Sequence, residues 1–159
     1  MSKPEDYLAL AVQLALDNVL IRKGRPFGAL LVKDGKIVAT AVNNVLASHD
    51  PTAHAELEAI RLAARAQQNP RLDGHVMYAS GHPCPMCLAA MYLVGIPQVY
   101  YAYSNEDGEP VGLSTSSLYA ELSKPLSMQA MRLEHRPVRP VGLDLYEAWK
   151  RLNHDLPKE

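Results

Sequence analysis

The sequence predicts a three-layer α/β/α sandwich around a mixed five-stranded sheet. Five short apolar segments alternate with segments of helical periodicity along the 159 residues, an order that is typical of α/β domains. An Asp-Gly pair between the first two apolar segments predicts a tight antiparallel hairpin. Apolar residues make up 48% of the chain and charged residues 21%, as in ordinary globular proteins. We therefore expect residues 1–159 to form one domain with its own core.

The N-terminal quarter is predicted to hold one helix followed by the hairpin. Residues 7–22 carry apolar side chains at helical spacing, and Pro4 suits a first helical turn. Residues 27–33 and 36–43 are the two apolar strands. Asp34-Gly35 lies between them, and both residue types tolerate the positive φ of a two-residue turn.

The rest of the chain continues the alternation of helices and strands. The middle elements are a loop at 44–52, a helix at 54–67, a strand at 75–80, a helix at 85–94 and a strand at 99–103. The later elements are a loop at 104–112, a short helix at 114–122, a fifth strand at 127–135 and a terminal helix at 143–153.

Charge and cysteine content exclude several classes of protein. The formal net charge is −1, which provides no positive field for a polyanion, so a nucleic-acid partner is not expected. No secretory signal or membrane span is recognisable. There are only two Cys residues and both lie in one short motif, so no disulfide framework competes for them and a reducing, cytoplasmic setting is expected.

Two short motifs carry the chemistry. His54-Ala55-Glu56 offers an imidazole and a carboxylate, and Pro83-Cys84-Pro85-Met86-Cys87 offers two thiols three residues apart. One His and two Cys are three soft ligands for a tetrahedral Zn²⁺ whose fourth position stays open for water. Because each motif opens a predicted helix, we expect one Zn²⁺ per chain between two helix N-termini, whose dipoles favour thiolate.

Glu56 is left without a metal bond and is the candidate catalytic residue. A carboxylate beside a zinc-activated water can take its proton and return it to a departing nitrogen. Two other interpretations remain open. A closed structural zinc site would need a fourth ligand, for which His82, His49 or His75 are available. A redox C-x-x-C would leave the His-x-Glu motif unexplained.

The motifs resemble the cytidine deaminase-like superfamily, in particular its bacterial guanine deaminase and nucleoside deaminase branch. H-x-E followed by P-C-x-x-C is the signature of zinc-dependent nucleobase deaminases. The resemblance also includes Pro26-Phe27-Gly28-Ala29, Asn43-Asn44 and Asp50-Pro51-Thr52-Ala53, and it covers about residues 5 to 103 well. It implies a hydrolase that acts on the C–N bonds of cyclic amidines, takes water and a small amino-heterocycle as substrates, and assembles as a homodimer.

The resemblance also implies which residues bind substrate. The backbone near Cys84 and Ala55 would help to hold the tetrahedral intermediate, and Asn43 would contact the ring. Phe27, the only Phe, is either a core residue or a wall of the pocket. The segment 143–159 would be a C-terminal helix that covers an active site, sometimes that of a partner subunit. Its Tyr146 and Trp149 would then contact substrate, and otherwise Trp149 is a packing anchor.

Three features depart from the pattern of the superfamily or of its guanine branch. His82 stands where a Glu is common, and residues 113–116 read Leu-Ser-Thr-Ser where that branch carries an acid. Its acid before the terminal helix has Glu134 and Asp144 as the nearest candidates. A carboxylate reads the N–H groups of guanine, whereas hydroxyls and imidazole suit other patterns. We therefore expect deamination of an amino-purine or related amino-heterocycle, with guanine as the first candidate. The alternatives are a tRNA adenosine-to-inosine deaminase, a cytosine or nucleoside deaminase, and a non-catalytic zinc-stapled binding domain.

Overall fold

The computed structural model describes residues 3–153. Its chain forms two compact units, Met1–Ser123 and Lys124–Glu159. The first unit contains α1 (Pro4–Leu20), β1 (Gly28–Lys33), β2 (Lys36–Val42), α2 (Val45–Ser48), α3 (Ala55–Gln67), β3 (His75–Gly81), α4 (Pro85–Val94), β4 (Gln98–Tyr103), α5 (Asn105–Gly108), the 3₁₀ helix η1 (Glu109–Val111) and α6 (Ser116–Leu122).

The sheet of the first unit is mixed and has the strand order β2-β1-β3-β4. β1 pairs antiparallel with both β2 and β3, whereas β3 and β4 are parallel and joined through α4. The hairpin turn has Asp34 at φ 49° and Gly35 at φ 73°, so both residues adopt the positive φ that a two-residue turn needs. The predicted mixed sheet and its Asp-Gly turn are therefore confirmed.

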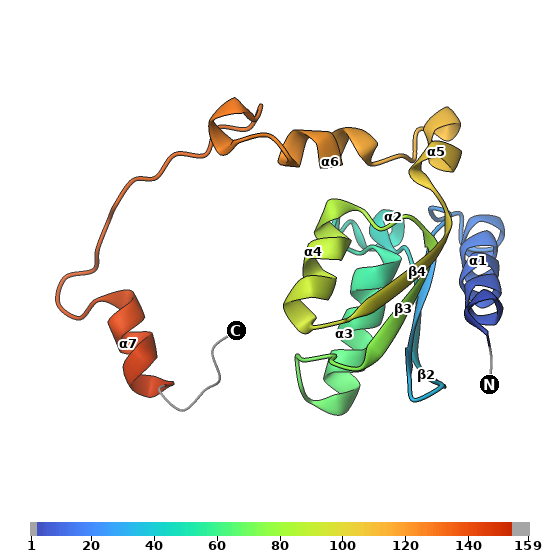
Figure 1. Ribbon diagram of the computed structural model, residues 1–159, viewed down its shortest axis with the longest axis horizontal. Coiled ribbons are helices and arrows are strands. Elements are labelled where there is room, and N and C mark those ends of the chain that lie inside the picture. Colours follow the sequence, from blue (N-terminus) through green and yellow to red (C-terminus); the bar gives the residue numbers. More distant parts are fainter. Residues whose placement is uncertain (1–2, 154–159) are drawn as a thin grey trace. The chain divides into compact units, whose positions relative to one another are not determined.

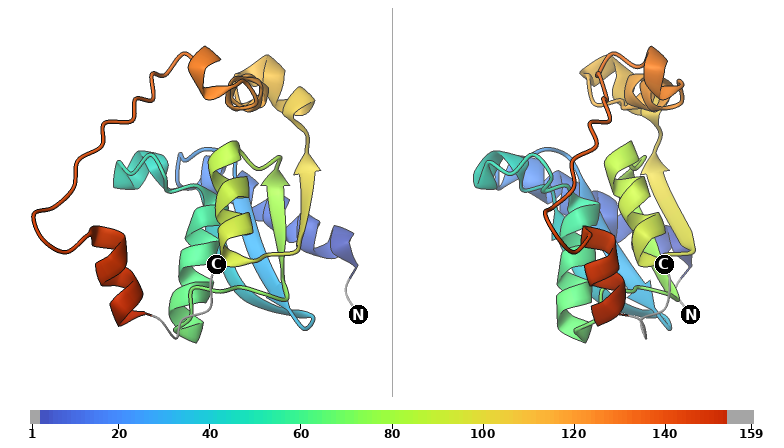
Figure 2. Two further views of the ribbon diagram at one scale, coloured as in Figure 1. Left: turned by 60° about the vertical axis from the view of Figure 1, so that its left-hand side comes forward. Right: turned by 90° about the vertical axis from the view of Figure 1, so that its left-hand side faces the viewer.

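Helices cover both faces of this sheet, as the α/β/α prediction requires. Figure 1 shows α1 on one face and α3 with α4 on the other, and the turned views of Figure 2 agree. Successive residues of a strand point to opposite faces. Leu31 of β1 accordingly belongs to the core beneath α3 and α4, and Leu30 to the core beneath α1.

The close approach of α1 to β1 depends on a glycine. A Cβ on Gly28 would lie 2.5 Å from the carbonyl oxygen of Ala11, a clash with backbone that cannot move aside. Gly28 also donates its N–H to the Ser80 hydroxyl across 3.0 Å. The start of β1, which leads directly out of the Pro26-Phe27 motif, is therefore held against both α1 and β3.

The predicted loops contain short helices that the sequence analysis did not predict. α2 lies within residues 44–52, and α5 with η1 lies within residues 104–112. For α5 the cause is a capping box, because Ser104 accepts from the Asp107 N–H while the Asp107 carboxylate accepts from the Ser104 N–H. No helix among the described residues is long and apolar enough to cross a membrane.

The second unit contains a 3₁₀ helix, η2 (Leu126–Met128), and α7 (Leu145–Leu152). The predicted fifth strand at 127–135 is wrong: the sheet has four strands among the described residues. Polar and apolar residues are interspersed along this segment, but a strand also needs a neighbouring edge for its backbone hydrogen bonds, and the structure pairs the segment with none. The predicted terminal helix is confirmed as α7, whereas positions 154–159 of the proposed covering segment lie outside the described residues.

Candidate active site

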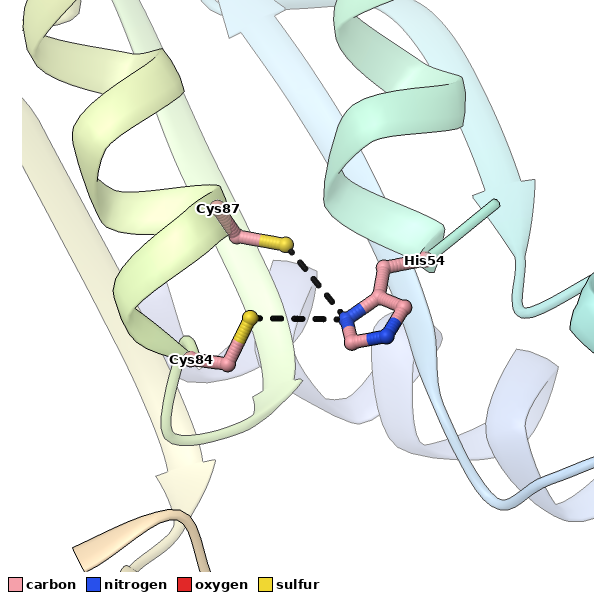
Figure 3. Close-up of side chains that lie close together, drawn as sticks. All are labelled: His54, Cys84 and Cys87. Atoms are coloured by element: carbon pink, nitrogen blue, oxygen red, sulfur yellow. Dashed lines mark hydrogen bonds between the residues drawn. The ribbon is translucent and has the colours of Figure 1, made fainter. Parts of the chain in front are cut away.

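Three predicted metal ligands meet where two helices begin. His54 is the N-cap of α3 and Cys84 is the N-cap of α4, while Cys87 lies in the first turn of α4. The Nδ1 atom of His54 is 3.5 Å from Cys84 Sγ and 3.6 Å from Cys87 Sγ (Figure 3). Helix starts point unpaired N–H groups and the positive dipole end toward the same spot, which favours negatively charged sulfur there.

The spacing of these atoms fits a tetrahedral zinc ion. With Zn–S of ~2.3 Å and Zn–N of ~2.0 Å, tetrahedral angles separate each sulfur from the nitrogen by about 3.5 Å. The two measured separations, 3.5 and 3.6 Å, match this value. Within residues 3–153, His54, Cys84 and Cys87 are the cluster that could hold a metal, and His49, His75 and His82 are not part of it. A fourth protein ligand is thus not assembled in the described chain, which leaves one position for water.

Hydrogen bonds within the cluster shift the pKa values of Cys84 and His54. A hydrogen bond from Cys87 and another from His54 lower the pKa of Cys84 to about 4. The hydrogen bond with Cys84 in turn raises the pKa of His54. These hydrogen bonds therefore favour the thiolate form of Cys84, which is the state that a zinc ligand requires.

Glu56 lies two residues after His54 and is almost fully buried. Its Oε2 atom accepts a hydrogen bond from Cys87 Sγ across 3.4 Å, so the carboxylate faces the ligand cluster. Burial raises the pKa of Glu56 above its usual range. A carboxylate that holds a proton readily, next to a metal-bound water, has the property of a proton shuttle.

A cavity of about 180 Å³ opens in front of these residues. We call His54, Glu56, Cys84 and Cys87 the metal corner. We call the polar side chains that line the rest of the cavity the rim, namely Arg25, Asn43, His82, Ser114 and Thr115. A larger and mostly apolar cavity of about 390 Å³ shares Phe27, His82 and Leu113 with it.

The predicted substrate-binding residues fall into three groups. Phe27, Asn43 and His82 line the catalytic cavity, and the Phe27 ring also packs on the core beneath α3 and α4. Ala55 is fully buried in that core and does not line the cavity, so its predicted contact with substrate stays a prediction. Tyr146 and Trp149 belong to α7 in the second unit, where both side chains are exposed. Their predicted contact with substrate stays a prediction.

Hydrogen bonds fix the orientation of two rim side chains. His82 Nδ1 lies 3.0 Å from the Pro83 carbonyl, which can only accept, so Nδ1 carries the proton and Nε2 is the acceptor of the neutral ring. Asn43 accepts from the Val45 N–H through Oδ1 across 3.2 Å, which leaves its NH₂ group as the donor for a ligand.

Tyr119, on α6, supports the His82 side chain. Its hydroxyl donates to the same Pro83 carbonyl, and its ring meets the imidazole edge-on with centroids 5.4 Å apart. Tyr101 also packs against His82, with centroids 4.7 Å apart. Burial raises the pKa of Tyr119 to about 12, so its hydroxyl remains a neutral donor at ordinary pH.

Arg25, Asn18 and Tyr119 were not predicted from the sequence. Arg25 directly precedes Pro26-Phe27, so its place beside a motif was the available signal. Asn18 interrupts the apolar pattern of the first helix, and buried polar residues in such a pattern usually have a partner. Tyr119 gave no signal, because its contact with Pro83 spans 36 residues.

With this geometry established, comparison with known proteins identifies the family. The cytidine and deoxycytidylate deaminase zinc-binding region matches residues 1–103 of the chain. The chain belongs to this deaminase family. It is accordingly a zinc-dependent hydrolytic deaminase, and the predicted zinc cofactor is confirmed.

The sequence similarity to known deaminases extends over most of the chain. Guanine deaminase from Bacillus subtilis is 40% identical over 146 residues, which cover 92% of this chain and 93% of that protein. Its crystal structure superimposes with a TM-score of 0.82 and covers 99% and 98% of the two chains. A tRNA-specific adenosine deaminase from Aquifex aeolicus is 33% identical over 82% of this chain and 84% of its own.

Proposed function

We propose that this deaminase releases ammonia from a small free amino-heterocycle, with guanine as the first candidate. The observation that carries this proposal is a small cavity with the buried Glu56 and the three-ligand cluster at one end and polar groups around the other. At about 180 Å³ the cavity suits a single heterocyclic base. The likeness to a guanine deaminase over nearly the full chain supports the choice of base.

The proposed chemistry divides between a metal and a carboxylate. His54, Cys84 and Cys87 would hold zinc, which lowers the pKa of water so that hydroxide is available near neutral pH. Glu56 carries two protons in turn: the first goes from the attacking water to the ring nitrogen beside the reacting carbon, and the second goes from the resulting hydroxyl group to the amino nitrogen as the C–N bond breaks. Ammonia leaves, and the reacting carbon is left as a carbonyl carbon. The net reaction adds one water and releases one ammonia.

The other side chains orient the ring in this proposal. Phe27 forms an apolar wall, and Asn43 donates from its NH₂ group. His82 Nε2 accepts an N–H of the substrate, which is the job that a Glu would do at this position. The backbone next to Ala55 and Cys84, at the two helix starts, stabilises negative charge that develops on the reacting carbon's substituents.

The C-terminal helix and a second subunit complete the proposal. α7 carries Leu145, Tyr146, Trp149 and Leu152 as large exposed apolar residues, a surface that needs a partner. We propose that the segment 143–159 covers an active site, that Tyr146 and Trp149 contact the substrate there, and that the protein works as a cytoplasmic homodimer.

This proposal expects Trp149→Ala to raise KM for the base without loss of zinc. Lys150→Ala serves as the control on the same helix.

The experiment that tests the proposed function is an ammonia-release screen of the zinc-loaded protein. Its panel holds guanine, adenine, cytosine, their nucleosides, amino-triazines and a tRNA anticodon stem-loop with adenosine in the loop. The proposal expects turnover of a free base, and guanine foremost. Turnover of the stem-loop alone would establish the tRNA deaminase alternative, which the Aquifex relative supports. Zinc binding without turnover of any compound would favour a zinc-stapled binding domain.

A further inference from the structure

Arg25 is a cation at the cavity that the fold does not use. Its side chain lines the catalytic cavity and is exposed. Its guanidinium makes no hydrogen bond or ion pair with any residue between positions 3 and 153. The same cavity is lined by His54, Glu56 and Cys84, so the guanidinium shares one cavity with the metal corner. Five N–H donors in a planar fork are thus available to a ligand.

The backbone of Arg25 is nevertheless held firmly. Asn18, which is only 2% exposed, donates from Nδ2 to the Arg25 carbonyl at 2.8 Å and to the Asn43 carbonyl at 3.0 Å. The turn packs directly on this side chain, because a Cβ on Gly24 would lie 2.5 Å from Asn18 Nδ2. One buried amide therefore fixes two rim residues relative to each other.

Two rim side chains, Arg25 and Asn43, offer donors to a ligand, whereas His82 Nε2 offers an acceptor. Glu56 is the one carboxylate that lines the cavity in the described chain, and it faces the ligand cluster. Arg25 contributes its guanidinium, and Asn43 contributes the NH₂ group that the Val45 contact leaves over. The Arg25 guanidinium and the Asn43 NH₂ group select ring atoms that accept hydrogen bonds, since an N–H group placed against these two donors would leave them without an acceptor on the ligand.

We propose that Arg25 is a specificity-determining residue that binds two adjacent acceptor atoms on the substrate ring, as O6 and N7 of guanine. This inference rests on the proposed function, because it assumes that the amino-bearing carbon faces the metal corner. The fork of a guanidinium matches the O6/N7 pair with two parallel hydrogen bonds. Arg25 therefore selects 2-amino-6-oxopurines over adenine, which presents an amino donor at position 6, and takes no part in proton transfer.

The test compares guanine with 7-deazaguanine, in which N7 is replaced by C–H and one of the two hydrogen bonds is lost. We expect kcat/KM to favour guanine by about tenfold or more in the wild type. In Arg25→Gln this ratio should fall close to one, and Arg25→Lys should lie between, because an ammonium lacks the planar fork. Arg22→Gln, which removes an exposed charge three residues earlier, should keep the wild-type ratio.

A binding measurement separates this inference from the proposed function. Xanthine keeps the O6/N7 edge and has no amino group, so its affinity for the zinc-loaded protein is measured by calorimetry without turnover. We expect Arg25→Gln to weaken xanthine about tenfold or more at an unchanged melting temperature. If guanine is not deaminated, the proposed function fails while the xanthine titration still decides the role of Arg25. Equal affinity in wild type and Arg25→Gln, or an unchanged guanine preference, would overturn the inference.

Discussion

The metal corner and the rim are placed by different means. The sulfurs and the carboxylate of the metal corner are buried, and its residues sit at the starts of α3 and α4. Most of the rim lies in connecting segments, and Arg25 is exposed while His82, Ser114 and Thr115 are half-buried. Helix starts fix the reacting groups to the scaffold, whereas loops can change without disturbing it. Substitutions in the rim can therefore change the choice of substrate while the metal corner keeps the same reaction type.

The largest expected effect is loss of the metal. Cys87 is fully buried, and the cluster in the described chain holds no further His or Cys, so Cys87→Ser should remove a zinc ligand. We expect zinc content to fall below one ion per chain, ammonia release to drop by ~10³-fold or more, and the melting temperature to decrease, because metal binding stabilises the folded state. Ala89→Ser, on the exposed face of α4, is the control and should keep zinc and activity. Full zinc content in Cys87→Ser would contradict its role as a ligand.

The second-largest expected effect is a loss of catalysis without loss of the metal. Glu56→Gln keeps the shape of the side chain but cannot carry a proton, so kcat should fall by about 10²- to 10⁴-fold while zinc content stays at one per chain. Glu58→Gln on the same helix removes an equal charge from the protein surface and should leave kcat within a few-fold. Comparable kcat values for Glu56→Gln and wild type would show that Glu56 is not the proton shuttle.

A smaller effect tests how the rim is attached to the scaffold. Asn18→Leu removes the donor shared by the Arg25 and Asn43 carbonyls, so the free energy of unfolding should decrease by about 1–3 kcal/mol and KM should rise. Zinc content should not change, because Asn18 contacts no residue of the metal corner. Gln13→Leu, an exposed change on the same helix, should leave KM unaltered. A stability loss without any change in KM would mean that Asn18 supports the fold alone.

The smallest effect concerns the support of His82. Tyr119→Phe keeps the ring contact but removes the hydroxyl that donates to the Pro83 carbonyl. Since one neutral hydrogen bond contributes about 1 kcal/mol, KM should rise by less than about tenfold and kcat should stay near wild type. Tyr92→Phe, a change to an exposed tyrosine on α4, is the control. A fall in kcat with unchanged KM would place Tyr119 in the reaction itself.

The comparison also explains what the sequence could predict. The metal corner was predictable because its residues occur as two local motifs, each beside a helix signal, and helix geometry carries the side chains to one place. The rim depends on contacts between distant segments: Asn18, Arg25 and Asn43 form a unit only after α1 and the hairpin pack together. The prediction of a fifth strand was wrong for the same reason, because the residue pattern at 127–135 does not show whether a sheet edge lies close enough to pair with it.

X-ray absorption at the zinc edge tests the central claim most directly. We predict two sulfur ligands at ~2.3 Å, one imidazole nitrogen at ~2.0 Å and one oxygen ligand that is not a protein atom, with the same spectrum in Glu56→Gln. The oxygen shell should change when an inhibitor or product enters the site. A second imidazole or a third sulfur in the zinc shell would show a closed site. An oxygen ligand that disappears in Glu56→Gln would show that Glu56 itself binds the metal. In either case the catalytic account would be wrong.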